Sequence, residues 1–111
     1  MNDRVSRLGL LVLGALAASP EDGRHGYWIA EKVVELTAGD SYSLSAIYDA
    51  LRALEKAGLV ERSGEEIVKG RARIYFKITG AGQMFGREQA TRDRQIAERA
   101  WGPPIPQGGV A

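Results

Sequence analysis

The side chains best suited to chemistry lie near the middle of the chain, in the segment SLSAIYDALRALEKAGLV (43–60). At about 100° per residue of an α-helix, the larger apolar residues of this segment fall on one side. The other side carries hydroxyls, a phenol, a carboxylate and two cations, namely Ser45, Tyr48, Asp49, Arg52 and Lys56. Such a stripe either faces water, as on most amphipathic helices, or contacts a polar ligand.

The composition of this stripe suits a helix that reads the major groove of DNA. Small residues at the helix start permit close approach, namely Ser43, Ser45 and Ala46. Arg52 can reach guanine or phosphate, and Lys56 can reach phosphate. The carboxylate of Asp49 is an argument against DNA binding, because phosphates repel a carboxylate. It would otherwise accept from a cytosine amino group or orient Arg52, which lies one turn away.

A basic segment follows, with four cations and no acidic residue between Ile67 and Ile78. The cations are Lys69, Arg71, Arg73 and Lys77. Strict alternation of apolar and polar residues predicts a strand here, with the cations on its outer face and near the turn that precedes it. Cations so placed contact phosphates and supply affinity without sequence information. The alternative is an ordinary solvated strand, and Glu65 and Glu66 before the turn weaken the positive field.

The composition excludes several other classes of function. There is no cysteine and only one histidine, His25, so disulfides, thiol catalysis and a cysteine or histidine metal site are not expected. No nucleophile–base pair is present, so we expect neither an enzyme nor a cofactor. The net charge of +1 neither demands nor forbids a nucleic-acid partner.

Periodicity and capping residues predict the order helix, helix, helix, hairpin, helix. The expected ranges are 4–18, 26–37 (ended by Gly39) and 43–58 (capped by Ser43, ended by Gly58) for three helices, 59–62 and 72–78 for the strands, and 80–101 (capped by Thr79) for the last helix. This is a mostly α protein with a small β-hairpin, a winged helix-turn-helix followed by a long C-terminal dimerisation helix. The expected division is a DNA-binding domain (1–79), the dimerisation helix (80–101) and a disordered tail (102–111).

The N-terminal apolar run, 8–18, follows two arginines and so imitates a secretory signal peptide. It is too short to span a bilayer, and without it a small domain would lose its main apolar helix. We therefore interpret it as a buried helix, and expect a cytoplasmic protein without membrane contact.

The first and last helices are the expected homodimer interface. The first is apolar nearly all round, so both of its faces must be covered, one by the domain core and one by a partner. The last has few apolar residues, as in a long arm packed along one thin seam. The expected interface residues are Leu8, Leu11, Val12, Ala15, Met84, Phe85 and Ile96.

Three stretches resemble the PadR-type bacterial transcriptional regulators: HGYWIAEKV, SLSAIYDALRALEKAGLVE and GRARIYFKITGAG. Together they cover most of residues 8–82. The family usually has glycine at the position of Ser45 and often threonine or proline at that of Asp49, and the second difference alters an expected groove-facing position. The resemblance implies a homodimer that binds a two-fold-symmetric operator and usually represses. It also implies, as in some short members, an apolar cavity in the dimer that accepts a small planar aromatic effector.

Four aromatic or titratable side chains have two interpretations each. His25 and Tyr27, at the start of the second helix, either contact phosphate or pack locally. Tyr48 lies on the edge between the polar and apolar stripes, and either contacts the groove or packs with its hydroxyl at the surface. Trp101 either stacks on a planar ligand or packs at the end of the last helix.

The leading hypothesis is therefore a homodimeric transcriptional repressor that binds a double-stranded DNA operator. The alternative is a winged-helix module that docks an acidic protein through its basic hairpin and does not bind DNA.

Overall fold

The computed structural model describes residues 5–105. Its elements, in chain order, are α1 (Arg7–Ala17), α2 (Gly26–Thr37), α3 (Leu44–Lys56), β1 (Val60–Val68), β2 (Arg71–Ile78) and α4 (Gly80–Trp101). The expected order and the winged-helix fold class are confirmed. Of the tail expected over 102–111, residues 106–111 lie outside the described residues.

Three helices begin at hydroxyl caps that free backbone N–H groups require. Ser43 accepts from the N–H of Ala46 at 3.1 Å, and Thr79 accepts from that of Gly82 at 2.9 Å. Ser6 accepts from the N–H of Gly9 at 3.0 Å. The apolar pattern predicts a start at residue 4. The structure begins α1 at Arg7 instead, because Ser6 is extended and caps the helix.

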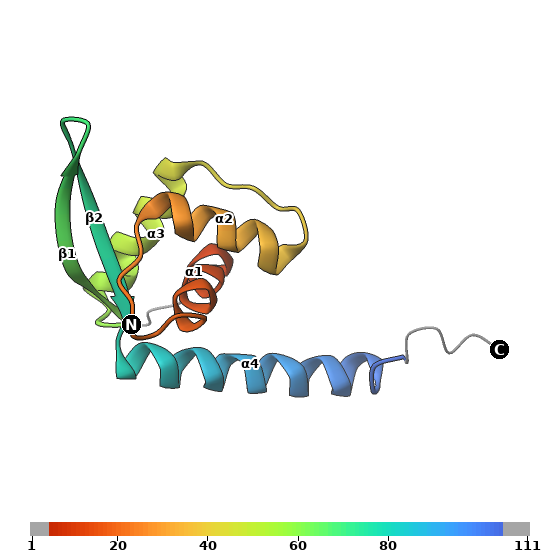
Figure 1. Ribbon diagram of the computed structural model, residues 1–111. Coiled ribbons are helices and arrows are strands. Elements are labelled where there is room, and N and C mark those ends of the chain that lie inside the picture. The colour runs from red at the N-terminus through yellow and green to blue at the C-terminus, as the bar shows by residue number, and fades with distance from the viewer. Residues whose placement is uncertain (1–4, 106–111) are drawn as a thin grey trace.

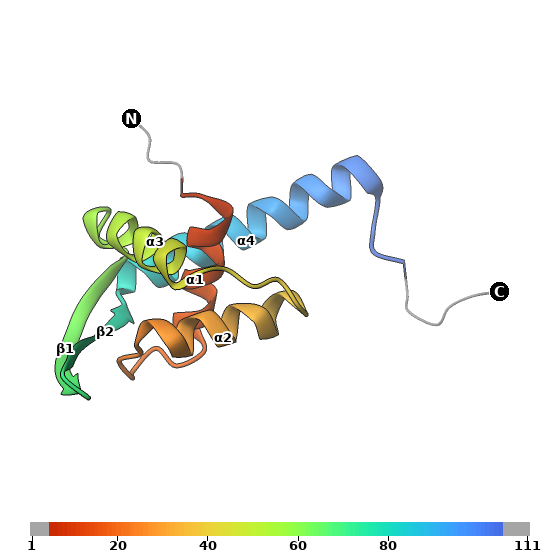
Figure 2. The ribbon, with the colours of Figure 1, turned by 90° about the horizontal axis from the view of Figure 1, so that it is seen from above.

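The core lies where α1, α2 and α3 meet the base of the hairpin. Its buried residues are Val12, Leu13, Ala15, Leu16, Ile29, Val33, Ile47, Leu51, Leu54, Leu59, Val60, Phe76 and Ile78. Figure 2 shows α2 and α3 on opposite sides of α1. The first helix is therefore the centre of the domain, as expected for a helix that is apolar on most sides.

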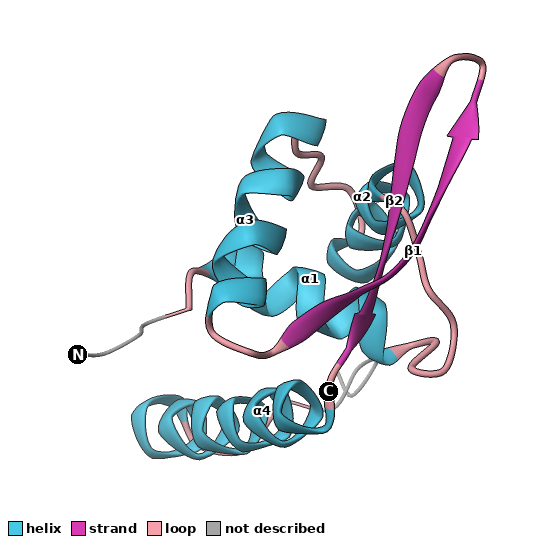
Figure 3. Cartoon of the chain, turned by 90° about the vertical axis from the view of Figure 1, so that its left-hand side faces the viewer, coloured by secondary structure: helices cyan, strands magenta, loops and turns pink. Residues whose placement is uncertain are grey.

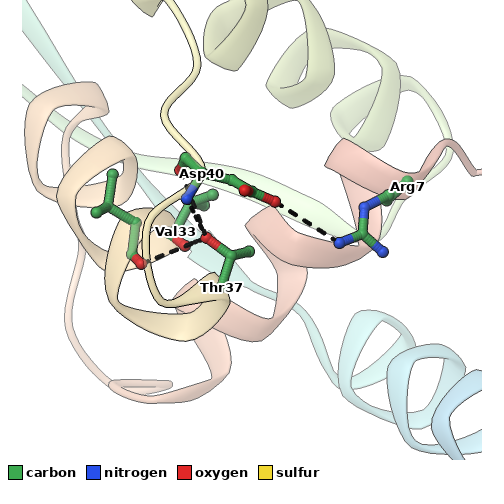
Figure 4. A network of polar contacts seen from close by, with 5 residues as sticks. Arg7, Val33, Thr37 and Asp40 are labelled. Atoms are coloured by element: carbon green, nitrogen blue, oxygen red, sulfur yellow. Dashed lines mark hydrogen bonds and ion pairs between the residues drawn. The ribbon is translucent and has the colours of Figure 1, made fainter.

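The connection from α2 to α3 is held by a small polar network (Figure 4). The hydroxyl of Thr37 donates to the carbonyl of Val33 at 2.9 Å and accepts from the N–H of Asp40 at 2.9 Å. The carboxylate of Asp40 lies 3.8 Å from the guanidinium of Arg7 on α1. The helix ends at Thr37, before the expected Gly39, and its C-cap residue Ala38 has a left-handed φ of 58°.

The hairpin is longer than the sequence predicts. Its first strand was expected over 59–62 but continues to Val68, because β2 supplies a pairing partner for a segment that has few β-branched residues. The turn residues Lys69 and Gly70 both have positive φ, 52° and 78°, as a two-residue hairpin turn requires. Figure 3 shows the tip of this wing extending beyond the helices.

The last helix starts tightly against the domain. The hydroxyl of Thr79 donates to the carbonyl of Gly58 at 2.8 Å, and Gly82 packs against the backbone of Leu59. From there α4 runs past α1 and away from the other helices (Figure 1). Every residue from Thr91 to Trp101 is exposed. The second half of α4 is therefore an arm that extends from the body of the domain.

Candidate nucleic-acid interface

The polar stripe of α3 lies on the surface. Ile47, Leu51 and Leu54 are buried on the inner side of the helix. The outward residues Ser45, Asp49, Arg52 and Lys56 are exposed, and Ala46 is half-buried at the first turn. Ser43 is also exposed, but its hydroxyl is occupied by the helix cap. The helix thus offers one continuous polar face of the kind that enters a major groove.

Two charges on this face are paired with each other. A guanidinium N–H of Arg52 donates to a carboxylate oxygen of Asp49, three residues earlier on the helix. Both side chains remain largely exposed, 63% for Arg52 and 68% for Asp49. Of the roles that the sequence allows for Asp49, this contact corresponds to the orientation of Arg52.

Tyr48 belongs to the contact between two helices and only in part to the polar face. Its half-buried ring packs beside Gly26, the first residue of α2. A Cβ on Gly26 would lie 2.7 Å from the Tyr48 ring, so the absence of a side chain there lets the ring lie over the start of α2. Tyr48 thereby fixes how α3 sits against α2.

The start of α2 faces the wing. His25 occupies the capping position without a side-chain cap, and its half-buried ring meets Tyr75 edge-on, with centroids 5.5 Å apart. Burial lowers the pKa of His25, and the positive charge of Arg73 lowers it further. Tyr27, one residue into the helix, is 61% exposed. His25 therefore packs locally, whereas Tyr27 is free to contact a ligand.

The wing has an acidic strand and a basic strand. Across the ladder Glu66 lies opposite Arg73, and Glu61 lies opposite Lys77. The hydroxyl of Tyr75 donates to Glu66, which raises the pKa of Tyr75. Arg73 is half-buried in this arrangement, whereas Lys69 and Arg71 at the turn are exposed. The positive charge that can meet a phosphate is therefore concentrated at the tip of the wing.

Arg24 holds the wing against the start of α2, although no sequence pattern indicates this role. Its backbone N–H donates to the carbonyl of Phe76 at 2.9 Å, and its carbonyl accepts from the N–H of Phe76 at 2.8 Å. Its guanidinium lies over the ring of Trp28, 4.3 Å from the centroid, and donates to Ser19 at 3.2 Å. This residue joins the wing to the start of α2. It lies in a loop without periodicity, so no local signal could reveal it.

The residues expected at a dimer interface fall into two groups. Leu8, Leu11, Met84, Phe85 and Ile96 are half-buried or exposed and remain available to a partner. Val12 and Ala15 are 0% exposed within the chain's own core, so their assignment to the interface is wrong. The cause is that a helix apolar on most sides does not reveal which face its own domain covers. Trp101 is 88% exposed at the end of α4.

Residues 5–105 contain no group of three or more His, Cys, Asp and Glu side chains that could hold a metal ion. Among the same residues, no helix combines the length and the apolar character needed to cross a membrane.

Comparison with known structures gives the same fold. A PadR family transcription regulator from hypervirulent Clostridium difficile has a TM-score of 0.69 at 22% identity, over 85% of this chain and 94% of that chain. A PadR family regulator from Eggerthella lenta has a TM-score of 0.67 at 21% identity, over 83% and 79%. Bacillus subtilis PadR, solved in complex with operator DNA, has a TM-score of 0.65 at 21% identity, over 96% and 55%.

Comparison with curated protein sequences gives no match. The family model described as the transcriptional regulator PadR-like family matches residues 12–88, well over half of the chain and all three segments of the candidate surface. Members of this family regulate transcription and are not enzymes, which confirms the class of protein expected from the sequence. The chain belongs to the PadR-like family of transcriptional regulators.

Proposed function

We propose that this protein is a homodimeric, sequence-specific DNA-binding repressor of a two-fold-symmetric operator. The observation that carries the proposal is the exposed polar face of α3, which lies beside a wing whose tip is basic. The complex of the Bacillus subtilis relative with operator DNA supports the same use of the fold. In the proposed mode α3 enters the major groove, and Arg52 and Lys56 contact bases or phosphates.

The wing and the start of α2 supply contacts to the DNA backbone in this proposal. Lys69 and Arg71 meet phosphates beside the groove, and Arg73 adds a weaker field because Glu66 faces it. No side chain caps the start of α2, so the backbone N–H groups of its first turn have no side-chain acceptor within the described part of the chain and suit a phosphate. Tyr27 is exposed there and contributes a hydroxyl, and the half-buried His25 stands two residues before it.

A second copy of the chain is the proposed partner of α1 and α4. The exposed arm from Thr91 to Trp101 carries Ile96 and Trp101 into solvent, and a 22-residue helix with so few contacts gains stability by packing on another chain. Two recognition helices in one dimer require two half-sites about 34 Å apart, one turn of DNA. Occupation of such a site blocks a promoter by exclusion.

A small planar aromatic compound is the proposed effector. A groove of about 410 Å³ lies between α1 and α4, and Leu10, Leu13, Gly14 and Gly86 are among its lining residues. Trp101 lies beyond this groove in its own chain, so any stacking on Trp101 takes place at the arm. A titration of the DNA-free protein with a planar aromatic dye tests this, because stacking would quench tryptophan fluorescence in the native chain and less so in Trp101→Phe.

The test of DNA binding is a gel shift with random-sequence duplexes and with the protein's own upstream DNA. Retardation of both at low salt, and of the upstream DNA alone at higher salt, is the expected result. Absence of retardation at low salt would favour the alternative, a winged-helix module that docks an acidic protein partner.

Arg71→Ala tests the proposed role of the wing. The variant should weaken binding to every duplex and reduce the slope of log affinity against log salt by about one, since one phosphate contact is lost. Lys32→Ala is the matched control, because it removes one positive charge from α2, where Lys32 pairs with Glu35 outside the proposed DNA contacts and dimer interface. Equal effects of the two substitutions would mean that net charge, and not the wing, determines affinity.

A further inference from the structure

The charge pair on the outer face of α3 has a geometry that bears on sequence discrimination. Arg52 donates from one guanidinium nitrogen to Asp49, and both groups stand on the exposed stripe with Ser45 and Lys56. The two residues are three positions apart, which places their side chains on the same helix face. The contact therefore lies on the polar face of α3, which faces the bases in the proposed DNA complex.

The pairing changes what Arg52 can offer to DNA. A guanidinium has five N–H donors in one plane, so the donors that Asp49 leaves free keep a defined direction. Guanine requires such a planar, two-donor approach, whereas a phosphate requires only positive charge nearby. The Asp49 carboxylate offsets that charge and repels phosphates itself. A paired Arg52 is thus a poorer phosphate ligand and a better oriented guanine ligand.

We propose that Asp49 is a positioning residue that holds Arg52 for guanine and withholds it from phosphate, and that it thereby determines sequence discrimination. This inference rests on the proposed function, because it assigns roles on the DNA-binding face. The inference predicts opposite changes in two measurable quantities, the affinity for any DNA and the preference for one sequence. Loss of the carboxylate should strengthen binding to any DNA and weaken the preference for one sequence.

The chain contains a matched control on the same helix. Glu55 lies on α3 but pairs with Arg62 at the base of β1, at 3.1 Å. Glu55→Gln removes one negative charge from α3 and leaves the Asp49–Arg52 contact in place. An effect of Asp49→Asn that Glu55→Gln does not share cannot be assigned to net charge.

The first experiment selects bound duplexes from a pool with randomised base pairs over about two helical turns. It is performed with the full-length native protein, Asp49→Asn and Glu55→Gln. The native chain and Glu55→Gln should select the same symmetric motif with a guanine in each half-site. Asp49→Asn should lose preference at that guanine. Selection of the same motif by Asp49→Asn, with undiminished preference, would overturn the inference.

Affinities for the selected duplex and for a scrambled duplex of the same composition give the size of the effect. Asp49→Asn should bind the scrambled duplex about threefold more tightly, as expected for release of an exposed ion pair. The ratio of the two affinities should fall about tenfold, as expected for loss of one guanine contact. Asp49→Glu, which can still reach Arg52, should restore much of the ratio.

A double-mutant cycle with Arg52→Ala identifies the path of the effect. If Asp49 acts through Arg52, Asp49→Asn should leave the affinity ratio unchanged in the Arg52→Ala background. The same loss in both backgrounds would show that Asp49 contacts DNA directly and would overturn the inference, as would loss of binding to both duplexes in a folded Asp49→Asn protein. If the native chain selects no motif, the proposed function fails and the inference with it. A motif that is insensitive to Asp49 refutes the inference alone.

Discussion

At the scale of single residues, Gly82 marks the closest approach of α4 to the domain. A Cβ at this position would lie 2.1 Å from the carbonyl oxygen of Leu59 and 2.8 Å from the side chain of Ile78. Because backbone blocks the way, Gly82→Ala should lower the free energy of unfolding by about 1–3 kcal/mol. Gly80→Ala, where a Cβ would meet no packing atom within 4 Å, is the control and should change stability little. Urea denaturation measures both, and equal effects would contradict the packing.

His25 should make stability depend on pH. Burial and Arg73 hold the folded-state pKa of His25 below its ordinary value of 6.5, so the unfolded chain takes up a proton first as the pH falls. The contribution of His25 is therefore present above pH 6.5 and is lost as the pH falls from 6.5 through the folded-state pKa. Urea midpoints at about pH 7.5 and 5.5 test this, since most carboxylates titrate below that window. His25→Gln should show a smaller difference between the two midpoints; an equal difference would assign the pH dependence to other groups.

At the scale of elements, the wing depends on a turn whose first residue is unusual. Lys69 has a φ of 52°, a left-handed conformation that costs most side chains about 1 kcal/mol and that asparagine tolerates better. Lys69→Asn should therefore raise the free energy of unfolding by roughly 0.5 kcal/mol, although it removes a cation from the wing tip. Lys77→Asn removes a cation from β2, outside the turn, and should bring no such gain. Thermal unfolding of the two variants distinguishes backbone strain from charge.

At the scale of the whole molecule, the exposed arm of α4 leads to a prediction about assembly. Ile96 is 49% exposed in the single chain, and the proposed dimer would bury it. Ile96→Glu should shift the protein from dimer to monomer in light scattering at micromolar concentration, because a buried unpaired carboxylate is unfavourable. Thr91→Glu adds the same charge about 140° away around the helix and serves as control. A native chain that is monomeric at every concentration would refute the dimer.

Local signals in the sequence are enough to predict which elements form and in what order. Hydroxyl caps at Ser43 and Thr79 and the spacing of Ile47, Leu51 and Leu54 are local signals, and local signals define helices because helical hydrogen bonds join residues four apart. The polar face of α3 followed from the same period. These features were predicted with nearly the observed boundaries, because each depends only on neighbours along the chain.

Which residues meet across the chain depends on how the elements pack in three dimensions. The full length of β1, the pairing of Arg24 with Phe76 and the packing of Tyr48 beside Gly26 join segments that no local pattern relates. The same holds for α1, where burial separates Val12 from the half-buried Leu8 although both are apolar. Hydrophobic burial has no direction of its own, so an apolar residue shows that it will be covered but not by what. The fold determines what covers each apolar residue, and it also determines the neighbours of every residue on the candidate DNA-binding surface.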